Sequence, residues 1–153
     1  MKLSVRGEYA LRALIVLGLN ADQAVVRIQT ISDQQNIPKR FLEQILNELR
    51  SAGILESKRG LGGGYRLKLP PEKITLAHVI RLIEGPLAPV SCVSEKYYAR
   101  CSCPSEEKCG IRSIMKEVRD AIVRILEGVT LAELCARVQQ LQGYRANPLD
   151  YVI

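Results

Sequence analysis

The stretch that decides the fold is FLEQILNELRSAGILESKRGLGGGYRL, residues 41–67. Its first half has apolar residues at helical spacing. The predicted helix begins at Pro38 and ends at Gly53, since proline suits the first turn of a helix and glycine its end. The second half has two β-prone runs around a glycine-rich turn, which predicts a β-hairpin over residues 54–69. The helix stripe expected to face the core comprises Phe41, Leu42, Ile45, Leu46 and Leu49.

Helical patterns flank this stretch on both sides. Ser4 and Thr75 are suitable N-caps for two of the helices, and Thr130 with Glu133 forms a capping box for the last one. Gly85 and Pro86 end the helix after Thr75, and an irregular segment follows. The further predicted helices span residues 4–20, 28–35, 75–84, 111–127 and 130–142.

Two helices joined by a tight turn and followed by a basic hairpin form a winged helix-turn-helix. We therefore predict a mainly α fold with a small β-hairpin wing, followed by a long dimerisation helix, because the apolar edge of residues 111–127 is wider than one small domain needs. The expected division is a DNA-binding domain over residues 1–85, a cysteine-bearing loop over 86–110, and a dimerisation helix with a C-terminal helix over 111–153.

The charge of the chain is concentrated in its first half. The net charge is +6, of which residues 1–70 carry +5 and residues 71–153 carry +1. A basic half beside a nearly neutral remainder indicates a polyanion as partner of the basic half. The apolar stretch near the N-terminus contains Glu8 and Arg12 and is followed by no small-residue cleavage site, so we expect a cytoplasmic protein rather than a secreted or membrane protein.

The polar face of the helix from Pro38 and the basic hairpin are the candidate DNA contacts. A helix fits the major groove, where its polar side chains reach base edges, and cations at its N-terminus meet phosphates. Glycines at the tip of the hairpin allow a close approach to the DNA backbone. The predicted DNA-binding residues are Lys39, Arg40, Glu43, Gln44, Asn47, Lys58, Arg59, Gly62, Gly63, Tyr65 and Arg66.

The sequence does not favour an enzyme. His78 is the only histidine, and no nucleophile or oxyanion motif accompanies it. The glycines of the hairpin do not stand between a strand and a helix, so they do not form a nucleotide-binding fingerprint.

Four of the five cysteines fall within 18 residues, with the spacing C-x8-C-x-C-x5-C. Thiolates in a loop of this kind can hold an iron–sulfur cluster, which prefers soft sulfur ligands. The alternatives are a cluster-free thiol switch in cationic surroundings, structural zinc, and no role at all. A small iron–sulfur redox or adaptor protein is a more distant alternative, which the basic hairpin disfavours. The four are Cys92, Cys101, Cys103 and Cys109, while Cys135 is expected to be a small buried apolar residue.

The stretch over residues 41–67, with the motif RGxGGGY, resembles the recognition helix and wing of the Rrf family of winged-helix transcription regulators, in particular its IscR-like members. The opening MKLSVRGEYALRAL and the segment ITLAHVIRLIEGP also resemble that family, so the similarity covers residues 1–127. The resemblance implies a homodimer on a palindromic operator of double-stranded DNA, with the helix near residues 112–127 crossing between subunits. We expect a repressor that senses iron–sulfur, iron or redox status.

The same resemblance implies a set of cluster ligands. Similar members supply three cysteines, which match Cys92, Cys103 and Cys109 here. IscR-like proteins have a histidine three residues after the last cysteine, where this chain has Arg112. Cys101 is an addition to the pattern: it replaces Cys103, has no ligand role, or is one of the two candidates for the fourth ligand. Glu8 is the other, because some members recruit an acidic residue from the first helix of the partner subunit. A [2Fe–2S] cluster is favoured over [4Fe–4S].

Overall fold

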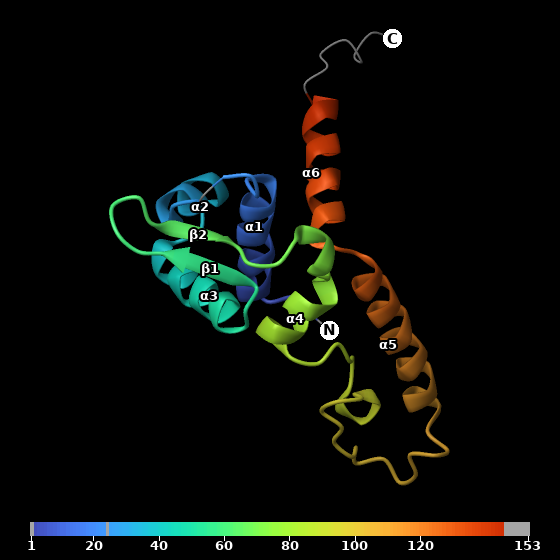
Figure 1. Ribbon diagram of the computed structural model, residues 1–153. Helices are drawn as coiled ribbons and strands as arrows, with labels where there is room; N and C mark the ends of the chain where they lie inside the picture. The colour runs from blue at the N-terminus through green and yellow to red at the C-terminus, as the bar shows by residue number, and fades with distance from the viewer. Residues whose placement is uncertain (1, 24, 146–153) are drawn as a thin grey trace, which may run out of the picture.

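The computed structural model describes residues 2–23 and 25–145, so the predicted third segment extends beyond it over residues 146–153. The described chain is mainly helical with a two-stranded antiparallel sheet (Figure 1), as the sequence predicts. The elements are α1 (Val5–Leu19), α2 (Ile28–Gln35), α3 (Lys39–Ser51), β1 (Leu55–Lys58), β2 (Gly64–Leu67), the 3-10 turn η1 (Pro71–Lys73), α4 (Leu76–Glu84), the 3-10 turn η2 (Ser91–Val93), α5 (Gly110–Gly128) and α6 (Leu131–Arg145).

Helix α1 supplies a large part of the core and packs against α3, α4 and α6. Ser4 caps it as predicted, because the Ser4 hydroxyl accepts a hydrogen bond from the Gly7 N–H at 3.1 Å. The Ser4 N–H donates to the Glu84 carboxylate at 3.0 Å, which ties the start of α1 to the end of α4. The fully buried apolar side chains of α1 are Ala10, Ala13, Leu14, Val16 and Leu17.

Helices α2 and α3 form the helix-turn-helix. Asn36 ends α2 in the left-handed backbone region, at φ 51°, which asparagine tolerates better than most residues. The Ser32 hydroxyl donates a hydrogen bond to the Ile37 carbonyl at 2.7 Å and closes the turn. Pro38 comes directly before the first residue of α3, and Gly53, at φ 77°, follows its end.

The core stripe of α3 is narrower than predicted. Leu42, Ile45, Leu46 and Leu49 are buried, but the Phe41 side chain is 55% exposed. At 100° per residue, Phe41 lies at the edge of this stripe, where α1 does not cover it. The assignment of Phe41 to the core was therefore wrong.

The hairpin is attached to the rest of the domain by a short bridge. Val26 and Tyr65 exchange two backbone hydrogen bonds of 2.8 Å, so the segment before α2 pairs with β2. A Cβ on Gly63 would lie 2.5 Å from the Lys58 carbonyl oxygen, so this tight turn admits only glycine there. Across the hairpin, the partners are Leu55 and Leu67, Glu56 and Arg66, Ser57 and Tyr65, and Lys58 and Gly64.

The turn between α5 and α6 is fixed to the start of α4. The Leu76 N–H donates to the Val129 carbonyl at 3.0 Å, and the Leu131 N–H donates to the Ile74 carbonyl at 2.7 Å. Thr75, between these two bonds, caps α4 as predicted. The C-terminal end of α5 is therefore joined to the winged domain by backbone hydrogen bonds.

Helix α6 begins with the predicted capping box. The Thr130 N–H donates to the Glu133 carboxylate at 2.8 Å, and the Glu133 N–H donates to the Thr130 hydroxyl at 3.3 Å. Cys135 is buried against α1, as expected of a small apolar residue, and a Cβ on Gly18 would lie 2.6 Å from its sulfur. The helix continues to Arg145, three residues beyond the predicted end.

Helix α5 leaves most of its apolar edge uncovered. Ile122, Val123 and Leu126 pack against α4 and are partly buried, while none of the 19 residues of the helix is fully buried. The large apolar side chains of α5 that remain exposed are Ile111, Ile114, Val118 and Ile125. Among the described residues, no helix is both long enough and apolar enough to cross a membrane.

Candidate nucleic-acid interface and cysteine loop

The solvent-facing side of α3 carries the first group of predicted DNA contacts. The five predicted contacts on α3 all have exposed side chains. One of them, Gln44, also lines an apolar hollow of about 550 Å³ between α1 and α3. The Arg6 guanidinium pairs with the Glu48 carboxylate and so removes one acidic charge from this surface. The exposed predicted contacts on α3 are Lys39, Arg40, Glu43, Gln44 and Asn47.

The hairpin separates the predicted wing residues into two groups. Lys58 and Arg59 are exposed beside the tip, and Gly62 has open space around it. Arg66 is also exposed but pairs with Glu56 on the opposite strand, so its charge is largely compensated. Tyr65 is half-buried against the hydrophobic core, which gives it a structural role that the sequence pattern did not indicate.

A basic hollow of about 500 Å³ lies between the hairpin and the start of α2. The Arg27 guanidinium donates to the Leu61 carbonyl at 3.4 Å, and the Arg50 guanidinium donates to the Ser57 hydroxyl at 3.2 Å. None of the residues along this hollow is acidic, so its cations attract a polyanion such as a nucleic-acid backbone. The sequence prediction did not include Arg27, because only folding brings it beside the wing. The cations along the hollow are Arg27, Arg50, Lys58 and Arg59.

Two of the loop cysteines meet at the start of α5. The Cys103 and Cys109 sulfurs are 3.8 Å apart. Cys109 is the N-cap of α5, and its sulfur accepts a hydrogen bond from the Arg112 N–H at 3.4 Å. That bond stabilises the thiolate and lowers the pKa of Cys109. Hydrogen bonds with Cys101 and Cys109 instead raise the pKa of Cys103 to about 12.

Glu106 organises the middle of the cysteine loop. Its carboxylate accepts a hydrogen bond from the Cys101 N–H at 3.4 Å and lies 3.8 Å from the Cys101 sulfur. The Tyr98 hydroxyl donates to the same carboxylate at 2.7 Å and lowers the pKa of Glu106. Cys92 is buried in η2, and burial, followed by the charge of Cys101, raises its pKa. The sequence prediction did not include Glu106, since acidic residues in a loop give no signal of such contacts.

Of the four loop thiols, Cys103 and Cys109 are in direct contact, and Cys101 and Cys92 influence the pKa values of their neighbours in the loop. Two thiolates on one tetrahedral metal are about 3.8 Å apart when each metal–sulfur bond is about 2.3 Å. The Cys103–Cys109 distance of 3.8 Å matches that value. Over residues 2–23 and 25–145, no three His, Cys, Asp or Glu side chains are arranged to hold a single metal ion. The spacing of Cys103 and Cys109 fits two thiolates on one iron, and the four loop thiols are soft donors of the kind that iron–sulfur clusters take.

Glu8, the second candidate for the fourth ligand, lies on the exposed side of α1. Its carboxylate is 3.7 Å from the Arg12 guanidinium, one helical turn away. The predicted contribution of Glu8 is to the loop of a partner subunit, so a single chain does not test it and it stays a prediction.

The chain is similar to known transcription regulators over most of its length. The Rrf2 family model, described as an iron-dependent transcriptional regulator, matches residues 3–137. The HTH-type transcriptional regulator IscR of Aliivibrio salmonicida is 33% identical over 143 residues, which cover 92% of this chain and 82% of that protein.

Two solved structures have the same fold. CymR, the global cysteine regulator of B. subtilis, is 31% identical with a TM-score of 0.76, and the match covers 90% of this chain and 98% of CymR. IscR of T. potens is 27% identical with a TM-score of 0.73, and the match covers 96% of this chain and 97% of that one. These relatives are regulators and not enzymes. The chain therefore belongs to the Rrf2 family of DNA-binding transcriptional regulators.

Proposed function

We propose that this protein is a homodimeric regulator whose affinity for its operator responds to an iron–sulfur cluster held by the cysteine loop, residues 86–110. The observation that carries this proposal is the presence of four thiols in the loop directly before α5, with the Cys103 and Cys109 sulfurs 3.8 Å apart. The description of the family model as iron-dependent also supports it. The loop thus lies between a DNA-binding domain, residues 1–85, and the dimerisation segment, residues 111–153.

The DNA-binding role of individual residues follows from their exposure and charge. Lys39 and Arg40 neutralise phosphates at the start of α3, and Glu43, Gln44 and Asn47 meet base edges. At the wing, Lys58 and Arg59 bind the backbone together with the cations of the basic hollow. Gly62 and Gly63 allow the wing tip to come close to the DNA, and Tyr65 and Arg66, which also stabilise the hairpin, remain proposed DNA contacts.

Dimerisation is supported by the exposed apolar edge of α5. Ile114, Val118 and Ile125 lie at helical spacing and are uncovered in the single chain. Pairing of this edge with a second copy gives a twofold dimer, whose two recognition helices match a palindromic operator. Binding over a promoter makes repression the expected effect.

The proposed cluster ligands are Cys92, Cys101, Cys103 and Cys109. Cys101 is favoured over Glu8 for the fourth position, because it belongs to the same loop as the other three thiols while Glu8 pairs with Arg12. A [2Fe–2S] cluster is favoured over [4Fe–4S], since each iron of the smaller cluster takes two thiolates and Cys103 and Cys109 already have that spacing. When bound, the cluster supplies sensitivity to iron and redox conditions.

The similarity to CymR, described as a cysteine regulator, favours a second candidate. In that case the loop thiols act without a cluster, either as a redox switch or as part of a response to a small effector. The DNA-binding and dimerisation surfaces are the same in both candidates.

The deciding experiment is an absorption spectrum with iron and acid-labile sulfide analysis on protein purified without oxygen. Visible charge-transfer bands with equal iron and sulfide, near two of each per chain, are expected for [2Fe–2S]. Cys103→Ser should abolish the bands, and Cys135→Ala, outside the loop, is the matched control that should keep them. Colourless, iron-free protein after attempted reconstitution would overturn the cluster proposal and favour the second candidate.

A further inference from the structure

Two arginines of α5 hold the turn that contains Cys92. The Arg112 Nε donates to the Cys92 carbonyl oxygen at 3.3 Å, and the Arg119 guanidinium donates to the Val93 carbonyl oxygen at 2.6 Å. Arg112 and Arg119 are seven residues apart and therefore lie on the same face of the helix. Consecutive carbonyls of η2 are thus bound by two arginines that lie two turns apart on one face of the helix.

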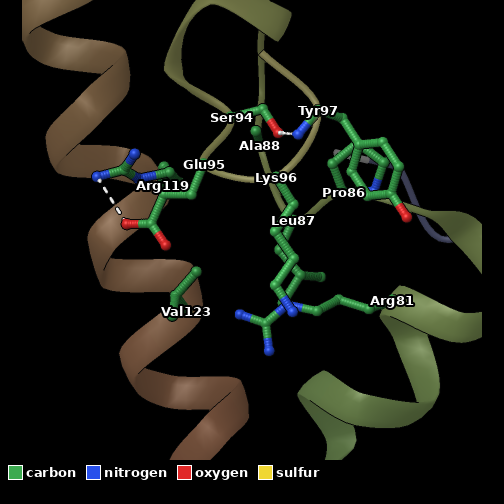
Figure 2. A pocket seen from close by; sticks show the side chains of 10 residues that line it. All are labelled: Arg81, Pro86, Leu87, Ala88, Ser94, Glu95, Lys96, Tyr97, Arg119 and Val123. Carbon is green, nitrogen blue, oxygen red and sulfur yellow. Dashed lines mark hydrogen bonds and ion pairs between the residues drawn. The ribbon is translucent and has the colours of Figure 1, made fainter.

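Arg119 is held firmly in this position. Its side chain is only 12% exposed, and its guanidinium also lies 3.6 Å from the Glu95 carboxylate and pairs with Asp120. Figure 2 shows Arg119 projecting from α5 toward Glu95, beside the loop segment that carries Ser94 and Tyr97. A partly buried guanidinium with several acceptors fixes both its own helix and the backbone that it contacts.

Arg112 connects two of the proposed ligands. Its side chain binds the Cys92 carbonyl, and its backbone N–H donates to the Cys109 sulfur at 3.4 Å. It stands where the family resemblance leads one to expect a histidine ligand. The side chain is directed to a backbone carbonyl instead, which is a positioning role rather than a ligand role.

We propose that Arg112 and Arg119 are positioning residues that join the cysteine loop to α5, so that the geometry of Cys92 and Cys109 and the orientation of the helix change together. The contacts of the two arginines with the loop do not depend on a cluster. Their use in signalling rests on the proposed function. The N-terminal half of α5 packs on η2 and its C-terminal half on α4. The two arginines therefore provide the polar part of the contact between the loop and the half of α5 that follows it.

The first test measures alkylation of Cys92 by iodoacetamide in cluster-free protein, residue by residue, by mass spectrometry. Arg119→Met should make Cys92 react about tenfold faster. A tenfold increase corresponds to a loss of about 1.4 kcal/mol in the free energy that holds the loop against α5. Arg119→Lys should give most of this increase, because an amine does not reproduce the contacts of a guanidinium. Arg124→Met, at an exposed position of the same helix, is the matched control and should leave the rate unchanged.

The alkylation rate of Cys135 reports whether a variant is generally unfolded, since this buried thiol lies away from the loop. If Arg119→Met is globally loosened by that measure, Arg119→Lys and Arg112→Met give the answer. If Cys92 in folded variants were alkylated at the wild-type rate, the proposal that the two arginines hold the cysteine loop on α5 would be overturned.

The second test compares the affinity of cluster-free and cluster-bound protein for a duplex selected by this protein from a random-sequence pool. Arg119→Lys should retain iron and sulfide. The difference in log affinity between its cluster-free and cluster-bound forms should be at most half of the wild-type difference. A full difference in the variant would overturn the inference while leaving the proposed function intact. A wild-type protein with no cluster would instead refute the proposed function, and the alkylation test would still decide the joining role.

Discussion

Replacement of Arg59 by alanine tests the DNA-binding surface most directly. Arg59 is exposed beside the tip of the wing and lines the basic hollow, which has no acidic side chain along it. Its charge is therefore available to a DNA phosphate. Each phosphate contact adds about 0.9 to the slope of log affinity against log salt concentration. A dimer has two wings, so Arg59→Ala should reduce the magnitude of the slope by about 1.8.

This slope predicts a specific pattern of affinities. Between 50 and 200 mM salt, the ratio of wild-type to variant affinity should shrink about twelvefold, for random and selected duplexes alike. Fluorescence anisotropy at four or more salt concentrations measures the slope. Arg124→Ala, which removes an equivalent exposed charge from α5, is the control and should keep the wild-type slope. Parallel lines for wild type and Arg59→Ala would refute the phosphate contact, even if the variant bound more weakly at every salt concentration.

Three further outcomes follow from the structure. Glu43→Ala should change which duplexes are enriched from a random pool, and unaltered enrichment would argue against a place near the bases. Ile125→Glu puts a charge on the exposed edge of α5 and should convert the dimer to a monomer in light scattering, while Arg124→Glu should not; a persistent dimer would point to another interface. Gly18→Val should lower the free energy of unfolding by about 1–3 kcal/mol in urea, because its side chain overlaps the Cys135 sulfur, and adding Cys135→Ala should restore part of the loss.

Local signals predicted most of the fold. The bounds of α2 matched, and the caps at Ser4, Thr75 and Thr130 lie where hydroxyl side chains followed by a helical pattern indicated them. These features depend on residues within one turn of each other, so the sequence alone contains the information. Phe41 was misassigned because periodicity gives the direction of a side chain but not how far the neighbouring helix extends over it.

The sites depend more strongly on contacts between distant segments. Arg27 joins the wing cations only through the bridge between Val26 and Tyr65, which no local pattern indicates. Arg119 likewise resembles any solvated arginine of an amphipathic helix until the loop 26 residues earlier in the chain is packed against it. Cys103 and Cys109, in contrast, are only six residues apart in the sequence, and closure of so short a loop keeps their sulfurs close, at 3.8 Å.

The hydrogen bonds that fix the turn between α5 and α6 to the start of α4 make α5 a lever with its pivot at Val129. The 19 residues of the helix give an arm of about 28 Å, with Cys109 at the moving end. A displacement of about 2 Å at that end, the size of typical helix shifts at subunit interfaces, turns the helix by about 4°. In a dimer joined along α5, a change of this size in the direction of the helix alters the distance between the two winged domains, far from the cysteine loop where it begins.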